Sequence, residues 1–363
     1  MTCQHCQTRQ YANFDYGTLY LLAPIAHTMT KLEHVLSQHN IANSMQDNML
    51  AITISGQMTD IAEILSNQLS HAEHKDTRTL FVAHDDSINA HQLMNARSLN
   101  ELLSQVSSRW LVEMIANNDL QVHLQPIVHA QDVTRVYAYE CLLRGISSTG
   151  DLISPKMMFD VAASAKLTYQ LDRAARLAAI RTVVDQSITS NVFINFNPTS
   201  VYDPRTCLRT TFAAIENAHL NPQQIVFEVT ESEYISDVPH LLDIITHYRK
   251  EGFRIALDDL GSGYGSLGLL AELKPDIVKL DRRLISNVDQ NEFQQSVLQS
   301  LLHMAQKLDI ETVAEGIERP EERDWLVEHG ATYLQGYLFG RPQARPSSPA
   351  DMIASNHYSA KMS

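Results

Sequence analysis

Acidic side chains stand at the ends of several apolar runs in this sequence, where a hydrophobic core would normally reject them. These carboxylates are Glu140, Glu228, Asp258, Asp259 and Glu315. At a single strand, such a residue is as readily a hydrogen-bonded core group as a functional one. Several carboxylates brought together would lose hydration and repel one another, so they need cations to be tolerated. The pattern therefore favours a metal site over a set of independent core residues.

Other polar residues extend this pattern. Asn195 and Gln335 end two further apolar runs, and Lys279 lies in another. Oxygen ligands without a nearby thiolate favour hard divalent ions such as Mg²⁺ or Mn²⁺. Adjacent Asp258 and Asp259 can reach two ions, and two ions suit the hydrolysis of a phosphoric ester. Lys279 would stay charged among these acids and could orient the attacking water or neutralise developing charge.

A glycine-rich stretch, 261–266, follows the two aspartates directly. Glycines allow positive φ and a close approach of the backbone to a ligand. A glycine cluster alone is typical of any turn between a strand and a helix. Its position after two acidic residues favours a functional loop.

Eight extended segments could position these side chains on one rim of a barrel. They are 122–128, 136–143, 192–195, 225–229, 254–258, 276–280, 310–314 and 332–335. A short turn joins the first two, which are predicted to form a hairpin, and helical patterns such as 155–185, 234–250 and 292–308 separate most later pairs. This alternation predicts a (β/α) barrel, whose active site lies at the carboxyl ends of its strands.

The segment before the barrel is predicted to form a small α/β domain. Extended runs and helical stretches alternate there, at 18–22, 27–38, 49–55, 58–69 and 79–83. A ferredoxin-like sandwich is one arrangement of such elements. Apolar spacing from Leu93 to Ile115 predicts a connecting helix. The expected divisions are a small domain over 1–90, the connecting helix over 91–117, the barrel over 118–350 and a tail over 351–363.

The composition is that of a folded, acidic protein. Of 363 residues, 44% are hydrophobic, and 28 basic against 42 acidic residues give a net charge of −14. Without a basic excess, binding to duplex nucleic acid is not expected. No apolar run is long enough to predict a membrane span, and the N-terminus lacks the apolar core of a signal peptide. Four cysteines do not make a disulfide framework, so a cytoplasmic location is the expectation.

Seven short motifs in this order resemble the EAL domain, the family of cyclic di-GMP phosphodiesterases. They begin at Glu140 (ECLLR), Asn195 (NFNP), Glu228 (EVTE), Asp258 (DDLGSGY), Lys279 (KLD), Ala314 (AEGIE) and Gln335 (QGY). The resemblance covers about residues 105–345 and implies a modified (β/α)₈ barrel with one antiparallel strand. It also implies hydrolysis of cyclic di-GMP to the linear dinucleotide pGpG with two Mg²⁺ or Mn²⁺ ions. Ca²⁺ would inhibit, and the protein would form homodimers.

The resemblance also assigns roles to single residues. One ion would bind Glu140, Asn195, Glu228 and Asp258, and the second ion would bind Asp258 and Asp259. The expected catalytic residues are Glu140, Asp258, Lys279 and Glu315. Of these, Lys279 would position or activate the nucleophilic water, and Glu315 would act through a bound water. The expected substrate contacts are Gln125, Leu143, Arg144, Asn195, Asp281, Glu318 and Gln335. The residues expected to couple the glycine-rich loop to a dimer contact are Glu231, Gly261, Gly263 and Tyr264.

Three residues depart from the family pattern. Cys141 replaces the alanine of the signature, and Leu260 and Gly265 replace a phenylalanine and a serine of the loop. Cys141 alternates away from Glu140 along its strand, which favours a small buried thiol over a chemical role. The loop changes remove no ligand, but they keep open the alternative of a weak or inactive cyclic di-GMP receptor. A metal phosphohydrolase with another substrate is the third hypothesis.

The N-terminal segment has few chemical signals. Cys3 and Cys6 flank His5 in a C-x-x-C pattern, but no second pair exists to complete a four-ligand zinc site. This favours an unstructured terminus over a metal or redox site. The resemblance implies a regulatory or dimerisation role for residues 1–90, whose own ligand the sequence does not reveal.

Overall fold

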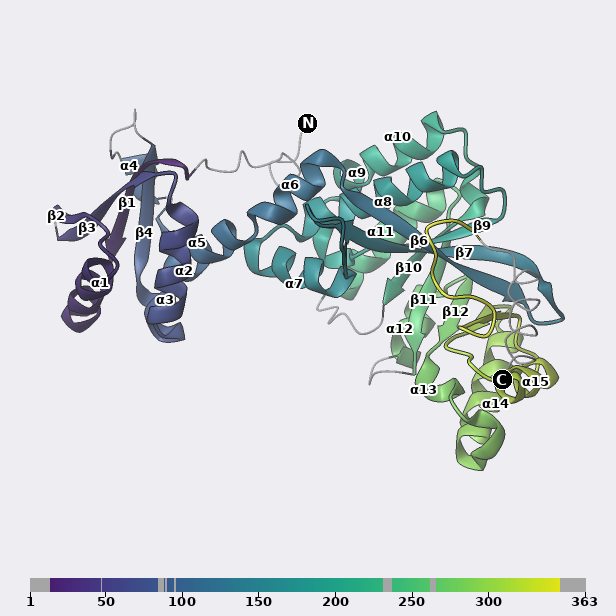
Figure 1. The fold of residues 1–363 in the computed structure, drawn as a ribbon. Helices are drawn as coiled ribbons and strands as arrows, with labels where there is room; N and C mark the ends of the chain where they lie inside the picture. The colour runs from purple at the N-terminus through teal and green to yellow at the C-terminus, as the bar shows by residue number, and fades with distance from the viewer. Residues whose placement is uncertain are drawn as a thin grey trace. The chain divides into compact units, whose positions relative to one another are not determined.

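The computed structural model describes residues 14–46, 48–83, 88, 90–94, 96–230, 237–261 and 266–346. These residues form two compact units, each of which is treated by itself (Figure 1). One unit contains the described residues up to Asn117 together with Lys156–Thr168, and the other contains Asn118–Pro155 and the described residues from Tyr169 onward. Cys3, His5, Cys6 and the expected tail over 351–363 lie outside the described residues.

The N-terminal unit is an antiparallel sheet with helices. Its elements are β1 Tyr16–Leu22, α1 Ala26–Gln38, β2 Asn43–Gln46, β3 Met49–Ser55, α2 Met58–Gln68, α3 His71–Asp76, β4 Arg78–Ala83, α4 Ala90–Met94, β5 Arg97–Ser98, α5 Leu99–Ser107 and α6 Arg109–Asn117. The strand order is β2-β3-β1-β4-β5, and its first four strands have the ferredoxin-like arrangement. The sequence did not predict β2, because its polar residues show no alternation of apolar side chains.

The helix expected over 91–117 is divided into α4, α5 and α6. Between the first two, Arg97 and Ser98 pair with β4 as strand β5. Ser98 then caps α5, because its hydroxyl accepts from the Glu101 amide while the Glu101 carboxylate accepts from the Ser98 amide. The apolar face of α5 lies in the N-terminal core, where Leu99 and Leu102 are buried. This part of the segment is therefore not a free connector.

The second unit is a closed barrel of eight strands with one additional strand, β8. The strands are β6 Leu120–His129, β7 Asp132–Ile146, β8 Leu152–Ile153, β9 Asn191–Asn195, β10 Ile225–Thr230, β11 Arg254–Leu260, β12 Ile277–Leu280, β13 Glu311–Ala314 and β14 Tyr333–Gln335. The order is β6-β14-β13-β12-β11-β10-β9-β7-β8, and pairing of β6 with β7 closes the ring. Only β6 runs antiparallel to its neighbours in the ring. The predicted hairpin, all eight strands and the single antiparallel strand are thus confirmed.

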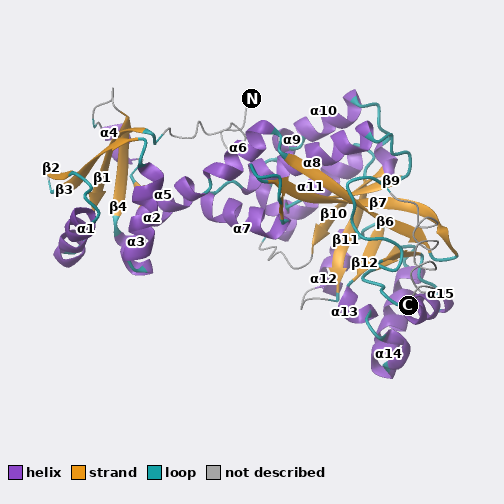
Figure 2. Cartoon of the chain, in the orientation of Figure 1, coloured by secondary structure: helices purple, strands orange, loops and turns teal. Residues whose placement is uncertain are grey.

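Helices surround the strands of this barrel (Figure 2). They are α8 Thr168–Asp185, α9 Pro204–Cys207, α10 Arg209–Asn217, α11 Val238–Lys250, α12 Ser266–Leu273, α13 Arg282–Ile285, α14 Glu292–Lys307 and α15 Pro320–Glu328, with 3₁₀ turns at Pro198–Ser200, Pro222–Gln224 and Val288–Gln290. A further helix, α7 Pro155–Ala165, is grouped almost entirely with the N-terminal unit. The helix expected over 155–185 is two helices, because Lys166 between them adopts a φ of 60°. Outward-facing strand residues pack against the helices in one large apolar core.

The inside of the barrel is filled by a separate apolar layer. This layer takes a residue from each strand of the ring, and its main members are Ile127, Ala138, Phe193, Val226, Ala256, Ile277, Val313 and Tyr333. At the amino-terminal end of the strands, Tyr137 and Tyr333 stack with their ring centroids 3.6 Å apart. Arg254 donates to the Tyr137 hydroxyl and pairs with Glu311 beside them. This end of the barrel is therefore closed by packing.

A buried ion pair holds the chain that follows β9. Asp172 and Arg176, both on α8, form a salt bridge, and neither side chain is more than 2% exposed. The Asp172 carboxylate also accepts from the Asn197 amide at 2.8 Å and from the Ser200 hydroxyl at 2.8 Å. Asp172 therefore fixes the turn that begins two residues after Asn195.

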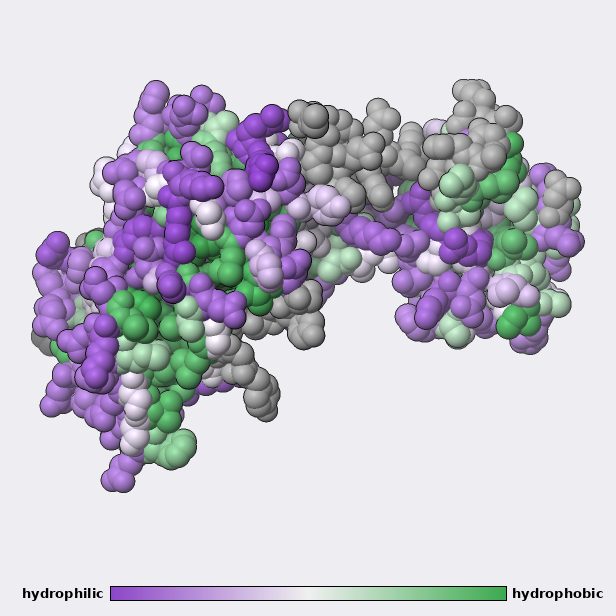
Figure 3. All heavy atoms as spheres, turned by 180° about the vertical axis from the view of Figure 1, so that it is seen from behind, coloured by the Kyte–Doolittle hydropathy of each residue, from purple (hydrophilic) through white to green (hydrophobic). Residues whose placement is uncertain are grey.

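The surface mixes polar and apolar residues. Hydrophobic residues lie in patches among hydrophilic ones on both units (Figure 3), and large exposed side chains on the barrel unit include Leu267 of α12 and Phe293 of α14. Among the described helices, none has the length and apolar character that crossing a membrane requires.

We expect Asp172→Asn to lower the free energy of unfolding by about 3 kcal/mol, because it leaves the Arg176 charge buried and unpaired. Urea denaturation followed by circular dichroism measures the change. Asp160→Asn is the matched control, since Asp160 also pairs with a basic residue one helical turn away, Lys156, but both side chains are exposed. The control should change stability by less than about 0.5 kcal/mol. Equal losses in the two variants would contradict the role given to the buried pair.

Candidate active site

A ring of polar side chains lies above the apolar layer inside the barrel. On each of the seven strands that run in one direction, the polar residue comes two positions after an apolar member of that layer, and on antiparallel β6 it comes two positions before. The ring consists of Gln125, Glu140, Asn195, Glu228, Asp258, Lys279, Glu315 and Gln335. Side chains two apart share a face of a strand, so these residues all face the interior at the carboxyl ends of the parallel strands. The structure thus brings together eight side chains that the sequence analysis selected.

Lys279 lies at the centre of this ring and is buried. Its Nζ is 2.7 Å from Glu315 Oε1, 2.8 Å from Glu228 Oε1 and 3.2 Å from Asp258 Oδ1. A fourth carboxylate, that of Glu140, lies 3.5 Å away. A single ammonium group therefore faces four acids from four different strands or strand ends.

Two amide side chains orient these acids. Asn195 Nδ2 donates to Glu228 Oε2 at 2.8 Å and to Glu140 Oε1 at 3.4 Å. Gln335 Nε2 donates to Glu140 Oε2 at 2.6 Å, while Gln335 Oε1 is buried without a hydrogen-bond partner. An unpaired buried acceptor inside a polar cluster indicates room for a further donor, such as a bound water.

Burial changes the proton affinity of the cluster. It raises the pKa of Glu228 and Asp258, and it raises the pKa of Glu315 to about 8, although the Lys279 charge opposes each shift. Burial alone would lower the pKa of Lys279, but the surrounding carboxylates raise it well above its usual value. Lys279 is therefore an ammonium, and the acids around it outnumber the one lysine, so that their full ionisation is unfavourable without further positive charge.

Asp258, Asp259 and Glu315 have carboxylate oxygens within 4.8 Å of one another. Adjacent residues on a regular strand face opposite sides, but the register of β11 shifts between Leu257 and Leu260. Asp259 also has a φ of 59°, which is rare for a residue other than glycine. This irregularity lets both aspartates reach the carboxyl-end mouth of the barrel. The sequence analysis expected the strand to end at Asp258, whereas β11 continues to Leu260. An all-oxygen cluster with excess negative charge fits hard divalent cations.

A cavity of about 240 Å³ opens onto the ring. Its lining includes the predicted residues Gln125, Glu140, Glu315, Glu318 and Gln335, together with Arg282, Gly316, Gly336 and Tyr337. The sequence analysis did not select the last four as site residues. Each of them follows a barrel strand closely, so their position after the strand ends was the signal that could have found them. At Gly336, a Cβ would lie 2.0 Å from the Ile317 carbonyl oxygen, so only glycine fits there.

The remaining predicted residues lie in different surroundings. Arg144 is half-buried near Glu140 and Tyr337, and burial lowers its pKa. Leu143 lies three residues from Glu140, so its side chain faces away from the ring. Its backbone carbonyl accepts a hydrogen bond from the Arg144 guanidinium at 2.7 Å. The Asp281 carboxylate accepts from the Arg283 amide and caps α13.

The predicted loop residues are described only in part. Gly261 has a φ of 101°, whereas Glu231, Gly263, Tyr264 and Gly265 lie outside the described residues. Cys141 is buried in the outer core, and its burial raises the pKa of the thiol well above the usual value. This agrees with the small packed side chain predicted for Cys141. Leu260 is also buried in that core.

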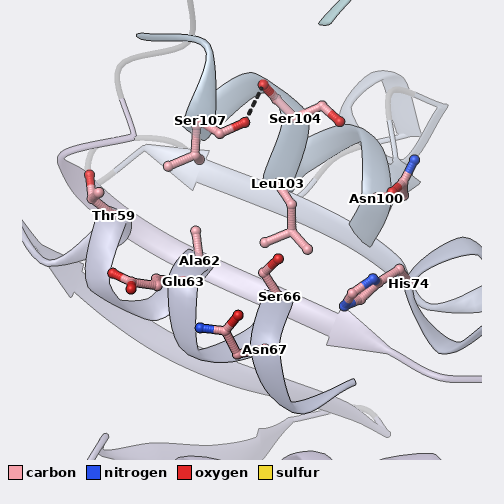
Figure 4. Close-up of a pocket in the computed structure, with 11 residues that line it drawn as sticks. Thr59, Ala62, Glu63, Ser66, Asn67, His74, Asn100, Leu103, Ser104 and Ser107 are labelled. Carbon is pink, nitrogen blue, oxygen red and sulfur yellow. Dashed lines mark hydrogen bonds between the residues drawn. The ribbon is translucent and has the colours of Figure 1, made fainter. Parts of the chain in front are cut away.

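A second cavity, of about 400 Å³, lies between α2 and α5 of the N-terminal unit (Figure 4). Hydroxyl and amide side chains such as Ser66, Asn67 and Asn100 line it, together with Leu103 of α5. Glu63 is the single carboxylate among its lining residues. This groove lacks the clustered acids that a metal site requires.

The chain is similar to curated proteins over about two thirds of its length. It is 33% identical over 238 residues to the probable cyclic di-GMP phosphodiesterase PdeB of Escherichia coli, covering 64% of this chain and 44% of that protein. It is 30% identical over 236 residues to the cyclic di-GMP phosphodiesterase PdeF of the same organism, covering 64% of this chain and 31% of that protein. The chain thus spans less than half the length of these curated relatives.

Solved structures extend the comparison. A standalone EAL protein from Vibrio cholerae O395, in its c-di-GMP-bound form, is 35% identical, with a TM-score of 0.57 over 63% of this chain and 95% of that chain. Klebsiella pneumoniae BlrP1, in a manganese and cyclic di-GMP complex, shares the fold at 22% identity, with a TM-score of 0.56 over 90% of this chain and 96% of that chain. The EAL domain model matches residues 108–342, which is more than half of the chain. The protein therefore belongs to the EAL domain family.

Proposed function

We propose that this protein hydrolyses cyclic di-GMP to the linear dinucleotide pGpG and depends on divalent metal ions to do so. The observation that carries the proposal is the complete polar ring, in which Lys279 contacts four carboxylates beside a cavity. Relatives named as cyclic di-GMP phosphodiesterases and a relative solved with bound c-di-GMP support the same substrate. The alternative is a receptor that binds this nucleotide without hydrolysing it.

The oxygen cluster would hold two Mg²⁺ or Mn²⁺ ions, with Glu140, Asn195, Glu228 and Asp258 toward one and Asp258 and Asp259 toward the other. When bound, such ions lower the pKa of a coordinated water and stabilise negative charge on phosphate oxygens. Ca²⁺ would inhibit, since it prefers longer bonds and more ligands than the site is expected to provide.

The side chains around this centre would manage protons and orientation. Lys279 keeps its proton, so it donates to the attacking water or to a phosphate oxygen and does not act as a base. Glu315 lies 2.7 Å from Lys279 Nζ at the ring, and once the ions have displaced its proton its carboxylate can act as a general base. The water attacks phosphorus and gives its proton to Glu315. The phosphorus–O3′ bond breaks, O3′ takes up a proton from solvent water, the proton on Glu315 returns to solvent, and pGpG with a 5′ phosphate results.

Replacing Glu140 by alanine should lower kcat/KM for cyclic di-GMP by about 100-fold or more, because the centre loses an acid that Asn195 and Gln335 hold in place. Chromatography of the nucleotides with Mg²⁺, Mn²⁺ or Ca²⁺ measures pGpG formation. Cys141→Ala is the matched control, because this neighbouring side chain packs in the outer core, and its activity should stay close to that of the wild type.

Three results would oppose this proposal. Wild-type protein that binds cyclic di-GMP yet forms no pGpG would favour the receptor. Equal losses of activity in Glu140→Ala and Cys141→Ala would indicate a general effect on the fold. Full turnover in the presence of a chelator would exclude the metal requirement.

The affinity for Mn²⁺ should rise with pH between about 6.5 and 8.5, because burial raises the pKa of Glu315 to about 8 and protons then compete with the ion. At the lower pH the ion must displace a proton, and at the higher pH the carboxylate is already charged. Isothermal titration calorimetry in two buffers with different ionisation heats should detect proton release at pH 6.5. A Glu315→Gln variant should show a smaller pH dependence, and an affinity independent of pH in the wild type would contradict the arrangement.

The N-terminal unit is proposed to regulate the barrel or to support a homodimer in the cytoplasm. Exposed Leu267 on α12, directly after the glycine-rich loop, offers apolar surface for a second copy. A fragment that tests this role begins at residue 108, because α5 packs in the N-terminal core and the family match begins there, although the N-terminal unit itself extends to Asn117.

A fragment comprising residues 108–363 should retain metal-dependent turnover, since both core clusters of the barrel consist of described residues from Val122 onward. Its oligomeric state or its turnover rate should differ from that of the whole chain. Light scattering after size exclusion and steady-state kinetics measure the two properties. If neither changes, residues before 108 have no regulatory or dimerisation role.

A further inference from the structure

The cavity at the polar ring has an unfavourable charge for an anionic substrate. Of the described residues that line it, three are acidic, Glu140, Glu315 and Glu318, and Arg282 alone carries a positive side chain. Cyclic di-GMP has two phosphodiester groups, and only one of them can occupy the acidic cluster at Asp258. With Arg144, near Glu140 and Tyr337, as one expected substrate contact, the second phosphate needs a further partner in or over this cavity.

The chain is shaped to bring Arg282 into the cavity wall. Gly316 has a φ of 69°, and a Cβ at this position would lie 2.4 Å from Arg282 Cγ. Because residue 316 is glycine, the aliphatic part of Arg282 packs directly on its backbone. The guanidinium group then reaches Glu318, with Arg282 Nη2 2.9 Å from Glu318 Oε1.

Arg282 can leave Glu318 for another anion with little loss of free energy. The two side chains are 58% and 42% exposed, and ion pairs with such exposure contribute about 0–1 kcal/mol. A phosphodiester offers two anionic oxygens to a guanidinium, which is a stronger and more directional contact. An incoming phosphate can therefore displace Glu318 from Arg282.

We propose that Arg282 binds the phosphodiester of cyclic di-GMP that is not hydrolysed, and that Glu318 holds Arg282 until the substrate arrives. This inference rests on the proposed function, since it assumes a substrate with two phosphates. Arg282 is thus a specificity-determining residue, which distinguishes a cyclic dinucleotide from a simple phosphodiester. Its release also frees the Glu318 carboxylate to accept hydrogen bonds from the substrate.

Neighbouring Arg283 provides a matched control. Its side chain is 76% exposed, its Nε is 3.7 Å from Asp281 Oδ1, and it does not line the cavity. Substituting methionine at either position keeps an aliphatic chain and removes the charge. Both variants lose one positive charge, so a difference between their substrate affinities depends on where that charge lies and not on the net charge of the protein.

The experiment measures KM and kcat for cyclic di-GMP with Mn²⁺, and the Kd for the same nucleotide with Ca²⁺. Arg282→Met should raise KM and Kd about tenfold, as expected for one charge-assisted contact, and change kcat by less than about threefold. Arg282→Lys should lie between this variant and the wild type, whereas Arg283→Met should behave like the wild type. With bis(p-nitrophenyl) phosphate, which has one phosphodiester, Arg282→Met should raise KM by a smaller factor than with cyclic di-GMP.

The outcomes separate this inference from the proposed function. If Arg282→Met leaves Kd unchanged, or impairs hydrolysis of the single phosphodiester equally, the assignment of Arg282 is wrong while the proposed function stands. If the wild type binds cyclic di-GMP without hydrolysing it, the proposed function is wrong and the Kd comparison still tests Arg282. If the wild type does not bind the nucleotide at all, both are overturned.

Discussion

One buried ammonium surrounded by four carboxylates is the interaction on which the site depends. Removing such charges from water is costly, and only close and well-oriented opposite charges compensate for it. Lys279 supplies one positive charge, and each acid around it belongs to a different strand or strand end. Distances of 2.7–3.5 Å across four strands therefore require a fixed strand register. The residual negative charge is what makes the centre suitable for added cations.

The barrel fixes the register because each strand contributes both an apolar residue and a polar residue to the interior. Along the inner face, an apolar residue such as Val226 or Val313 belongs to a layer without water, and the polar residue two positions further on belongs to the ring. A slip of one residue in register would turn a carboxylate such as Glu228 toward the helices and an outer-core residue such as Val229 toward the ring. Hence the large outer core, which fixes the register, also fixes the geometry of the acids.

The period of two also explains which features the sequence could predict. Side chains alternate along strands regardless of their partners, so Glu140, Asn195 and Lys279 could be placed on the inner face from the sequence alone. The same rule argues against Leu143, an odd number of positions from Glu140, as a side chain facing the ring. The division of a helix by β5 could not be predicted in this way, because β5 is defined by its pairing with β4.

Contacts between distant segments account for the other features that the sequence did not reveal. The left-handed conformation of Asp259 depends on the bulge in β11, and the burial of Asp172 and Arg176 depends on the turn after β9. Arg282 becomes part of the cavity only because Gly316, from a different strand end, leaves room for it. Nothing in the local sequence around any of these residues shows such a partner.

The buried centre and the exposed rim differ in what a substitution costs. At the ring, the loss of Lys279 leaves its four acids without their shared positive charge inside the barrel, so stability and chemistry are lost together, whereas the loss of one acid leaves three others beside Lys279. At the rim, Arg282 and Glu318 are partly exposed, and their replacement costs little stability. Leu260 is different again, since it is buried in the outer core and can act on the glycine-rich loop only through packing. For the proposed hydrolysis, an intact set of acids is therefore necessary but insufficient to fix the rate, because substrate binding is adjusted by exposed rim residues and the loop is adjusted through packing in the outer core.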